Sequence, residues 1–581
     1  MIMAHGLVEW REWGKDAFGE AERDGKLVLL DISAVWCHWC HVMDETSYSD
    51  KEVAGFINRK FVPVRVDTDR MPDVNERYNM GGWPTTAILT PNGEVLMGAT
   101  YVPPEKLMET LEQLAGFYDE NRAAVKEKAA ELALRKAADL QAETPTADVS
   151  AEIIACVLGE MDSHYDPVHG GFDDAPKFPA PDTIELLLTA YTDTGKKQYL
   201  EVAETTLSGM SDYGMYDHEM GGFFRYSVTK DWTIPHFEKM LDVNSGLLLN
   251  LLDAYRLTGS SRYVATARKT IDYLNTWLWS EEGWFYGSQD ADEEYYKLPL
   301  TEREKLPPPY VDKTLFTNLN ARMSYAYLTA WEVLHDKRYK DQALRNLDFI
   351  LNRMKNESGG FYHYHDGKPQ RPGLLTDQSA MLRTLLYAYQ LTADGRWLDE
   401  AMSVLKFMRE TLWDDKKGGF FDLPHDPGAV AALAYRAKPM PENSEAARAL
   451  ITLSILTADN DYADMAAKCL APFASSHCDY SYLASSYALA VDFMLKENTA
   501  LAFVGDLGSE SMGYLTEAAG EVFVPRRVMR LMDSTRQIDE IREMGYKDSG
   551  KPAVYICRGT VCAAKIEDPA KLKEELSKKT A

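Results

Sequence analysis

Basic residues and long apolar runs are both scarce in this sequence. Lys and Arg number 63 against 90 Asp and Glu, which gives the 581-residue chain a formal charge of −27 at pH 7. So large a negative charge disfavours binding to nucleic acids and anionic membranes, whose phosphates are also negative. No stretch reaches the roughly 18 apolar residues that a membrane-spanning helix needs, so we expect no transmembrane segment.

Cysteine is scarce as well. The chain has 7 cysteines in 581 residues, an odd number that excludes a fully paired disulfide scaffold. Residues 1–6 lack the basic region and long apolar run that mark a secretory signal. Proteins that keep their cysteines free usually work in reducing compartments, so we expect a cytoplasmic protein.

The overall composition is that of a globular protein. Hydrophobic residues make up 45% of the chain and charged residues 26%, which is enough to build packed cores and excludes wholesale disorder. A chain of 581 residues exceeds the usual size of one domain and suits two to four.

Residues 1–120 have the pattern of an α/β domain. Nearly continuous apolar runs at 26–32 and 61–67 are typical of strands covered on both faces. The Asn92-Gly93 turn favours a hairpin between two further strands. The two strands of this hairpin are predicted at 85–90 and 94–97. Helices are predicted at 50–58 and from 104 onward.

Residues 148–495 contain an internal repeat built from two markers. One is a polar turn followed by an aromatic residue and a helix-period apolar run, and the other is Gly-Gly-Phe or a close variant. Helical hairpins bury their apolar faces only against neighbours, so about six of them predict a closed (α/α)6 toroid. The alternative is an open helical solenoid. The marker aromatics are Tyr199, Tyr263, Tyr339, Trp397 and Tyr462, and Phe172, Phe223, Phe285, Phe361 and Phe420.

The remaining segments complete the predicted domain organisation. Residues 121–147, rich in Ala, Glu and Lys, are predicted to be a helical linker. Residues 496–581 return to short apolar runs and a terminal helical pattern, which predicts a small C-terminal α/β lobe. The whole is therefore a multidomain protein with an α/β domain, an all-α six-hairpin toroid and an α/β lobe.

The sharpest motif is the pair Cys37 and Cys40, which follows the strand at 26–32 and begins a helical stretch. Two cysteines three apart at a helix start can close a small disulfide ring, and the helix N-terminus stabilises the thiolate of the first. His38 between them adds positive charge, which favours a higher reduction potential. This predicts a redox-active pair in which Cys37 is the nucleophile.

Three other interpretations fit the same residues. Cys-x-x-Cys-His is also the signature of c-type haem attachment, which needs an export route. Cys37, Cys40, His38 and His41 supply atoms that bind zinc, but structural zinc sites use two separated ligand pairs and no second pair lies nearby. The third alternative is a redox domain that has become a scaffold. We expect no metal and no other cofactor.

Residues 26–105 resemble thioredoxin, with the landmarks in the same order. The resemblance implies that Asp31 is a buried acid that handles the proton of Cys40 and that Arg65 faces it. It also implies that Pro84 is the cis-proline beside the cysteines. The surroundings of the redox site would be Trp36, His38, Trp39, His41, Arg65, Trp83 and Pro84.

A wider resemblance covers nearly the whole chain. Its motifs are Cys37–Met43, Gly81–Pro84, Tyr101–Pro104, Ala175–Pro179, Gly221–Tyr226, Pro235–Leu241 and Asp290–Asp292. Together they resemble the thioredoxin-domain-containing family that includes spermatogenesis-associated protein 20. The resemblance implies a thioredoxin-like domain fused to a six-hairpin barrel similar to glycosidases and epimerases. The chain departs from the family pattern in two places. Trp36 replaces a small polar residue that is common in the family, and Asn318-Leu-Asn320 stands where relatives usually read Trp-Asn-Gly.

Polar residues gather in the loops that follow the Gly-Gly-Phe markers, and equivalent loops emerge at one end of a toroid. They are therefore predicted to line one pocket, where opposed carboxyls suit glycoside hydrolysis and a base with an acid suits epimerisation. The alternative is that they cap helices or bind loop backbone. The candidates are Asp173, Lys177, Arg225, Trp232, His236, Glu238, Lys239, Asp290 and Asp292, with His236 and Glu238 the best pair.

The remaining cysteines have simpler interpretations. Cys557 and Cys562 lie five apart after a predicted strand, as a second thiol pair that either exchanges with the front pair or stays unpaired. Cys156, Cys469 and Cys478 fall in helical stretches and are predicted to be core residues.

The sequence leaves three functional hypotheses. The favoured one is a thiol–disulfide oxidoreductase that acts on a protein disulfide or thiol substrate. The second is a carbohydrate-active enzyme, an epimerase or glycoside hydrolase, that holds a sugar in the barrel and is regulated by the front domain. The third is a non-enzymatic binding scaffold.

Overall fold

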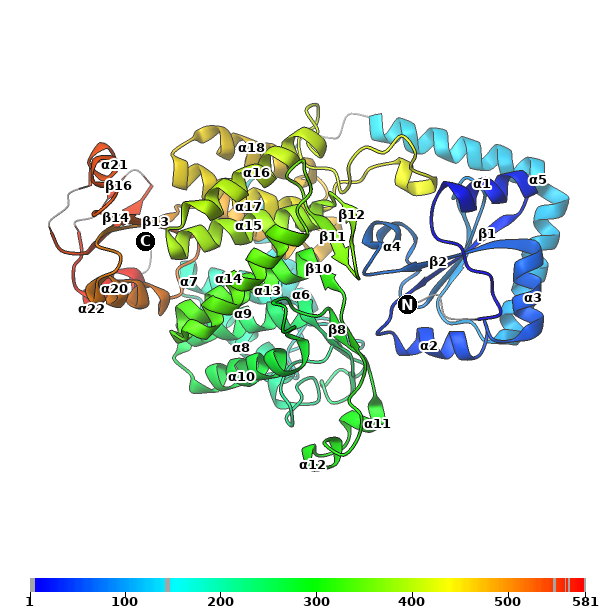
Figure 1. Ribbon diagram of the computed structural model, residues 1–581, viewed down its shortest axis with the longest axis horizontal. Helices are drawn as coiled ribbons and strands as arrows, with labels where there is room; N and C mark the ends of the chain where they lie inside the picture. The colour runs from blue at the N-terminus through cyan, green and yellow to red at the C-terminus, as the bar shows by residue number, and fades with distance from the viewer. Residues whose placement is uncertain (1–5, 142–146, 547–549, 560, 563–564, 579–581) are drawn as a thin grey trace. The chain divides into compact units, whose positions relative to one another are not determined.

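The computed structural model describes all residues except 1–5, 142–146, 547–549, 560, 563–564 and 579–581 (Figure 1). It divides into two compact units. The first comprises residues 1–144 with 422–437, and the second comprises residues 145–421 with 438–581. Among the described residues, no helix combines the length and the hydrophobicity that crossing a lipid bilayer requires, as the sequence predicted.

The first unit is built on a four-stranded sheet in the order β2-β1-β3-β4. Strand β1 runs parallel to β2 and antiparallel to β3, and β3 pairs antiparallel with β4. All seven residues of β1 are buried, which explains its nearly continuous apolar sequence. The strands are β1 (Leu27–Ser33), β2 (Phe61–Asp67), β3 (Thr85–Leu89) and β4 (Val95–Ala99).

Helices pack around this sheet. Leu27 and Leu29 of β1 share one core with Val53 and Ile57 of α3 and with Leu107 of α5. The helix α5 runs unbroken from Pro104 to Gln141, so the linker predicted from residue 121 continues the last helix of this unit. The helices are α1 (Lys15–Asp24), α2 (His38–Glu45), α3 (Lys51–Lys60), α4 (Pro72–Tyr78) and α5.

Residues 422–437 interrupt the helical repeat in sequence and pack against α4 of the first unit. Arg77 donates to a carboxylate oxygen of Asp422 at 2.6 Å, and the Ala432 N–H donates to the Tyr78 hydroxyl at 3.0 Å. Nothing in the sequence pattern indicated this insertion, because the contacts join residues more than 340 positions apart.

The second unit contains the predicted toroid. Within the described residues, six inner helices contact one another in a closed ring, α7–α9–α13–α15–α17–α19 and back to α7, which rules out an open solenoid. Each inner helix packs against an outer helix, and the first outer helix of the chain, α6, pairs with the last inner helix, α19. The inner helices are α7 (Pro181–Thr194), α9 (Leu241–Thr258), α13 (Thr317–Leu334), α15 (Leu375–Thr392), α17 (Met440–Thr457) and α19 (Ser485–Leu495). The outer helices are α6 (Ala151–His164), α8 (Lys197–Asp212), α10 (Ser261–Tyr273), α14 (Lys337–Arg353), α16 (Gly395–Thr411) and α18 (Asn460–Leu470).

The Gly-Gly-Phe markers are turns that lead into the inner helices, as their glycines suggested. Gly221 has φ of 85°, and a Cβ there would lie 2.3 Å from the Lys269 carbonyl oxygen, so only glycine fits. The marker phenylalanine Phe223 is buried, and its N–H donates to the side chain of Asn244 in α9 at 2.7 Å. The same amide clamp recurs at Asn320, Gln378 and Asn443.

Short elements fill the loops before the inner helices. They are β5 (Tyr226–Ser227), β6 (Pro235–His236), β7 (Lys239–Met240), β8 (Ser288–Gln289), β9 (Val311–Asp312), β10 (Leu315–Phe316), β11 (Tyr362–His365), β12 (Pro369–Pro372), α11 (Glu293–Tyr296) and α12 (Leu300–Arg303). The segment before α19 is formed by η3 (Ala471–Phe473) and η4 (His477–Ala484).

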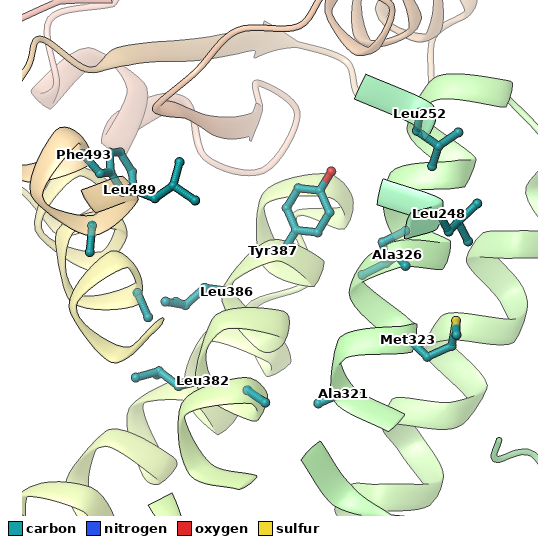
Figure 2. Close-up of a cluster of buried hydrophobic side chains, with 14 of the residues drawn as sticks. Leu248, Leu252, Ala321, Met323, Ala326, Leu382, Leu386, Tyr387, Leu489 and Phe493 are labelled. Atoms are coloured by element: carbon teal, nitrogen blue, oxygen red, sulfur yellow. The ribbon is translucent and has the colours of Figure 1, made fainter. Parts of the chain in front are cut away.

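The barrel core consists of buried aliphatic side chains from the inner helices. Leu248 and Leu252 lie on α9, Met323 on α13 and Leu382 on α15, and all four are buried (Figure 2). Neighbouring inner helices therefore pack against one another through apolar side chains, and their polar residues lie toward the axis of the ring.

The C-terminal lobe has the strand order β14-β13-β15-β16. As in the first unit, the first strand in sequence lies parallel to the second and antiparallel to the third, and the third pairs antiparallel with the fourth. The lobe therefore repeats the topology of the N-terminal sheet, which its sequence did not reveal. Its elements are β13 (Thr499–Gly505), α20 (Glu510–Gly520), β14 (Arg527–Asp533), α21 (Ile538–Glu543), β15 (Ala553–Arg558), β16 (Val561–Cys562) and α22 (Pro569–Ser577).

Candidate functional site

Cys37 and Cys40 form a disulfide at the start of α2, just beyond the end of β1. Cys37 is the N-cap residue of this helix, and its Sγ accepts a hydrogen bond from the N–H of Cys40 at 3.2 Å. Only 4% of Cys37 and 2% of Cys40 is exposed, so the oxidised pair is largely covered by its neighbours. Cys37 thus lies at a helix N-cap, a position at which the helix dipole favours negative charge.

Trp36 and Trp39 directly precede the two cysteines in sequence, and each contacts a further aromatic ring. The buried Trp36 ring lies edge-on to the Trp83 ring at 5.7 Å, and its indole N–H donates to Asp69 at 2.5 Å. The Trp83–Pro84 peptide bond is cis. Trp39, by contrast, is 45% exposed and lies 5.4 Å from the Tyr101 ring. His38 and His41 are exposed.

Asp31 is buried in β1 and faces Arg65 of β2, as expected from the resemblance. The Arg65 Nε atom donates to an Asp31 oxygen at 2.7 Å, and the Tyr48 hydroxyl donates to the other oxygen at 3.3 Å. Arg65 is shared, because its Nη1 atom also donates to Asp44 at 3.2 Å. The Tyr48 hydroxyl in turn lies 3.2 Å from the Thr86 hydroxyl.

The balance of these contacts sets the acidity of Asp31. Burial raises the pKa of this carboxyl, while the Arg65 guanidinium lowers it, and the net result is a pKa of about 6. Such a carboxyl is mostly ionised at neutral pH but accepts a proton far more readily than an exposed aspartate. Sequence reasoning found Asp31 and Arg65 but missed Tyr48 and Asp44, which only the packing of α2 brings to the cluster.

A cavity of about 530 Å³ occupies the axis of the barrel. It extends along the inner helices, from Asp182 and Glu442 in their first turns to Asp253 and Arg256 near the C-terminal end of α9. Residues 523–527 of the C-terminal lobe contribute to its wall. Leu386, Tyr387, Leu489 and Phe493 supply apolar parts of the lining (Figure 2).

Most of the charged groups around this cavity are paired. Arg448 donates to Glu185 at 2.5 Å, and Arg322 donates to Glu445 at 3.2 Å. Although burial alone raises the pKa of Glu185, the Arg448 and Arg383 guanidinium groups bring it below its ordinary value. The sequence signal for this lining is a polar residue every third position on an otherwise apolar helix, as in Glu442, Glu445 and Arg448 of α17.

Asp182 is the exception within the described residues, since its carboxylate makes no hydrogen bond or ion pair. It is the second residue of α7, and its side chain is open to the cavity. Burial within the barrel and the neighbouring Glu185 raise the pKa of Asp182. An unpartnered carboxyl with a raised pKa, next to an ionised one, is an arrangement that suits acid–base chemistry.

The nine barrel residues predicted from the loops do not line this cavity. Lys177 and Lys239 are fully buried and bind Asp166 at 2.6 Å and Asp217 at 2.7 Å, so they hold the turns together. Trp232 is also buried, with its indole N–H bound to the His169 carbonyl. The charges of these two lysines are therefore used inside the turns.

The other six candidates lie in the same loops. Asp292 caps α11 by accepting from the Tyr295 N–H at 2.9 Å, and the Asp290 N–H donates to the Tyr310 carbonyl. The Nδ1 atom of His236 lies 3.3 Å from a carboxylate oxygen of Glu238. Asp173 is bound by the Tyr482 hydroxyl at 2.8 Å, and Arg225 lies 5.3 Å from the Tyr226 ring.

Two of the three cysteines predicted to be core residues differ from that prediction. Cys469 is buried as expected, but Cys478 is exposed and Cys156 half-buried, so these two are not core residues. Their Sγ atoms lie 2.9 Å apart although 322 residues separate them in sequence. In the C-terminal lobe, Cys557 is disulfide-bonded, so the alternative that it stays an unpaired thiol is wrong. It lies directly opposite Cys562 across the β15–β16 pair, and the side chain of Cys562 lies outside the described residues.

These features define a protein that joins an α/β thioredoxin-like domain with a Cys-x-x-Cys disulfide to a helical six-hairpin barrel. Comparison with known proteins agrees. Residues 2–136 match a family described as "Protein of unknown function, DUF255", with the short name Thioredox_DsbH. Over 99% of its length the chain is 24% identical to spermatogenesis-associated protein 20 of Homo sapiens, covering 90% of that protein. The resemblance expected from the motifs is thereby confirmed.

Other known proteins align with one part of the chain each. A thioredoxin H-type of Fagopyrum esculentum is 34% identical over 16% of this chain and 75% of its own. A sugar epimerase from a ruminal bacterium aligns with 55% of this chain and 84% of its own, at 14% identity and a TM-score of 0.46. The GH76 alpha-mannanase of Bacteroides thetaiotaomicron aligns with 60% of this chain and 96% of its own, at 14% identity and a TM-score of 0.45.

Proposed function

We propose that the N-terminal unit is a thiol–disulfide oxidoreductase whose reacting atoms are the sulfurs of Cys37 and Cys40. The observation that carries this proposal is the placement of Cys37 at the N-cap of α2, with its sulfur accepting the N–H of Cys40. Unsatisfied N–H groups and the helix dipole stabilise negative charge at that position. The reduced Cys37 is therefore a thiolate, and hence a nucleophile, near neutral pH.

In the proposed cycle the Cys37 thiolate attacks one sulfur of a substrate disulfide. A bond forms between Cys37 and that sulfur, the substrate S–S bond breaks, and the second substrate sulfur leaves as a thiolate. Cys40 then loses its proton and attacks the Cys37 sulfur, which releases the first substrate sulfur and closes the Cys37–Cys40 disulfide. Two electrons pass to the substrate, and an external dithiol restores the reduced pair.

Asp31 is the proposed acceptor of the Cys40 proton. Its pKa of about 6 leaves the carboxylate free to accept a proton at neutral pH, and its burial keeps bulk water from competing for that role. Arg65 and Tyr48 hold the carboxylate in position through hydrogen bonds to its two oxygens. These are positioning residues, since neither touches the sulfurs in the proposed cycle.

The proposed substrate is a protein disulfide or thiol in a reducing compartment such as the cytoplasm. Trp39 lies between the two cysteines in sequence and is exposed, and its ring contacts the half-buried ring of Tyr101. Aromatic surfaces with a polar edge are typical of peptide-binding sites.

The reduction of insulin disulfides with dithiothreitol as the electron source tests this function. We expect the full-length protein to accelerate the reaction and Cys37→Ser to abolish the acceleration, because no other sulfur occupies the helix N-cap. Cys40→Ser is expected to accumulate a mixed disulfide with the substrate. Cys469→Ser, a buried free cysteine in α18, is the matched control and is expected to keep full activity. Equal rates for wild type and Cys37→Ser would remove the proposal in favour of a scaffold.

A second candidate function resides in the barrel cavity. We infer that the cavity holds a polyhydroxylated ligand such as a sugar, because its lining combines charged hydrogen-bonding groups with aromatic and aliphatic walls. The observation that favours acid–base chemistry there is Asp182, an unpartnered carboxyl with a raised pKa that is open to the cavity. Its partner in that chemistry is the ionised Glu185.

Ligand-observed NMR with a panel of monosaccharides and disaccharides tests the second candidate. We expect binding to the wild type and a loss of about tenfold in affinity for Asp182→Asn, the scale of one charge-assisted hydrogen bond. Asp174→Asn changes an exposed carboxyl outside the cavity and is expected to have no effect. If no member of the panel binds, or if both variants bind equally well, the carbohydrate hypothesis is wrong.

A further inference from the structure

Two cysteines and a histidine meet at the point where the helical ring of the barrel closes. Cys156 lies on α6, the first helix of the barrel, and His477 and Cys478 begin η4, just before the last inner helix. One ligand atom of each of the three residues lies within 4.8 Å of the other two. We propose that Cys156, His477 and Cys478 bind a zinc ion.

The orientation of His477 is the observation that favours a metal. Its Nδ1 atom lies 2.9 Å from the Ala474 carbonyl oxygen, to which it can only donate, so its proton resides there. In the neutral imidazole the lone pair that can bind a metal is then on Nε2, which lies 3.3 Å from the Cys478 sulfur. A histidine that donates one ring N–H to a backbone carbonyl and directs the other nitrogen at a common point has the arrangement seen in metal ligands.

The distances between the ligand atoms suit zinc after a small adjustment. Zinc–sulfur bonds of about 2.3 Å in tetrahedral geometry separate two sulfurs by about 3.8 Å. The Cys156 and Cys478 sulfurs are 2.9 Å apart, so they have to separate by about 0.9 Å. Cys478 is exposed, so its side chain has room to move.

The chemistry of the three ligands selects the kind of metal. Two thiolates and an imidazole favour a soft or borderline ion and disfavour Mg²⁺ and Ca²⁺, which prefer oxygen. Three protein ligands leave the fourth tetrahedral position of Zn²⁺ to water. The exposed location of Cys478 gives that water access.

The position of the site indicates what the ion does for the fold. The outer helix α6 comes first in the barrel sequence but packs against η4 and α19, which come last. An ion bound to Cys156 and Cys478 joins segments that are 322 residues apart in sequence. It therefore links the first helix of the barrel to the segment before the last inner helix, which no direct chain connection joins. Zinc binding is therefore expected to stabilise the barrel, because it occurs only when the ring is closed.

Metal titration of the full-length chain tests the site. The parent variant carries Cys37→Ser and Cys40→Ser, so that the front pair cannot bind metal, and is kept reduced and stripped of metal. Zn²⁺ is titrated in competition with a chromogenic chelator, and Co²⁺ reports thiolate ligation by its charge-transfer absorption. We expect one equivalent of Zn²⁺ attributable to this site, a cobalt–thiolate band, and a higher melting temperature with Zn²⁺.

Single substitutions in that parent assign the ligands. Cys156→Ser and Cys478→Ser are each expected to remove one equivalent and the associated cobalt–thiolate band. His477→Phe keeps a ring beside Tyr487 but is expected to weaken binding on the order of tenfold or more. Cys469→Ser is the matched control and is expected to change neither readout. Cys557 and Cys562 are present in every variant, so their contribution cancels.

Two outcomes overturn the proposal. One is that Cys156→Ser and Cys478→Ser retain the stoichiometry of the parent. The other is that the parent binds no Zn²⁺ and instead yields a Cys156–Cys478 disulfide when the reductant is removed. Because the parent lacks the front cysteines, neither outcome bears on the proposed redox function.

Discussion

At the scale of the residue, Asp31 is a buried carboxylate in the central part of the thioredoxin-like sheet. Its carboxylate is buried next to one guanidinium that it shares with Asp44. A whole positive charge would hold the pKa of an aspartate low. Here burial outweighs the shared charge, and the pKa rises to about 6.

Replacing this carboxyl is expected to change how stability depends on pH. The pKa of Asp31 is higher in the folded state than its ordinary value of 3.8, so the folded protein binds the proton more tightly. The free energy of unfolding therefore falls as pH rises from about 4 to about 6 and is level above that. Asp31→Asn lacks this titrating carboxyl. Its free energy of unfolding relative to that of wild type should therefore rise by about 1–3 kcal/mol as the pH increases from about 4 to about 6.

Denaturant unfolding of the oxidised protein between pH 4 and pH 8 measures this difference. Tyr48→Phe is the companion variant. The Tyr48 hydroxyl lowers the pKa of Asp31, so its removal is expected to move the window to higher pH. A difference between Asp31→Asn and wild type that is the same at every pH would contradict the argument.

At the scale of the element, four of the six barrel repeats in the described residues are each held by one amide side chain. Asn320 accepts from the Phe285 N–H at 2.7 Å and donates to the carbonyls of Phe285 and Phe316. It thereby ties a Gly-Gly-Phe-type turn to the first turn of α13. Asn320 is the third residue of the Asn318-Leu-Asn320 sequence.

Asn320→Ala is expected to destabilise the barrel by about 2–4 kcal/mol, because it leaves a buried N–H and buried carbonyls without partners. Asn352→Ala in α14 is the control, since that side chain is exposed and its loss is expected to cost less than about 0.5 kcal/mol. Thermal unfolding followed by circular dichroism compares the two. Equal melting temperatures would show that the clamp contributes nothing.

The two α/β sheets offer a second comparison at this scale. In the C-terminal lobe, Ser509 caps α20 and accepts from the Met512 N–H at 3.3 Å. Cys37 caps α2 and accepts from the Cys40 N–H in the same way. The lobe thus has the strand order and the helix cap of the first unit, with serine and methionine where the first unit has its cysteines.

At the scale of the whole molecule, a buried ionic cluster joins the C-terminal lobe to the barrel. Glu332 of α13 is bound by Arg256 of α9 at 2.7 Å and by Arg527 of β14 at 2.5 Å. The Tyr387 hydroxyl donates to it at 2.8 Å. Although burial by itself would raise the pKa of Glu332, Arg527 and Arg256 lower it to about 2.

Glu332→Gln is expected to loosen the lobe, because it leaves two buried guanidinium groups without their carboxylate. Breaking a buried pair in this way costs about 3–5 kcal/mol. The folded-state pKa of Glu332 lies below its ordinary value of 4.5, so this stabilisation is present above about pH 4.5 and is lost as pH falls toward 2.

Hydrogen exchange of β14 in wild type and Glu332→Gln at neutral pH measures the effect. Glu521→Gln, which removes an exposed carboxylate on the same lobe, is the control and is expected to leave exchange unchanged. Unaltered protection of β14 in Glu332→Gln would mean that the other contacts of the lobe, such as those of Arg526 with Asp193 and Asp492, suffice to hold it.

The sequence by itself determined the local features of this protein. The apolar run of β1, the Asn92-Gly93 hairpin, the Cys37–Cys40 pair at a helix start and the repeating turns all depend on neighbours within a few residues. Period, turn chemistry and capping act at that range, so a single chain displays them. The closed ring followed from counting hairpins, each of which needs a neighbour on both sides.

Only the tertiary structure decided which charged groups face one another. Lys177 and Lys239 were predicted to line a pocket but are buried in ion pairs. Asp182, which the sequence analysis did not single out, lies in the first turn of α7 and faces the cavity. The meeting of Cys156 with Cys478 likewise depends on ring closure. Coulombic energies and metal ligation depend on distance in space, and contacts between residues hundreds of positions apart leave no periodic trace in one sequence.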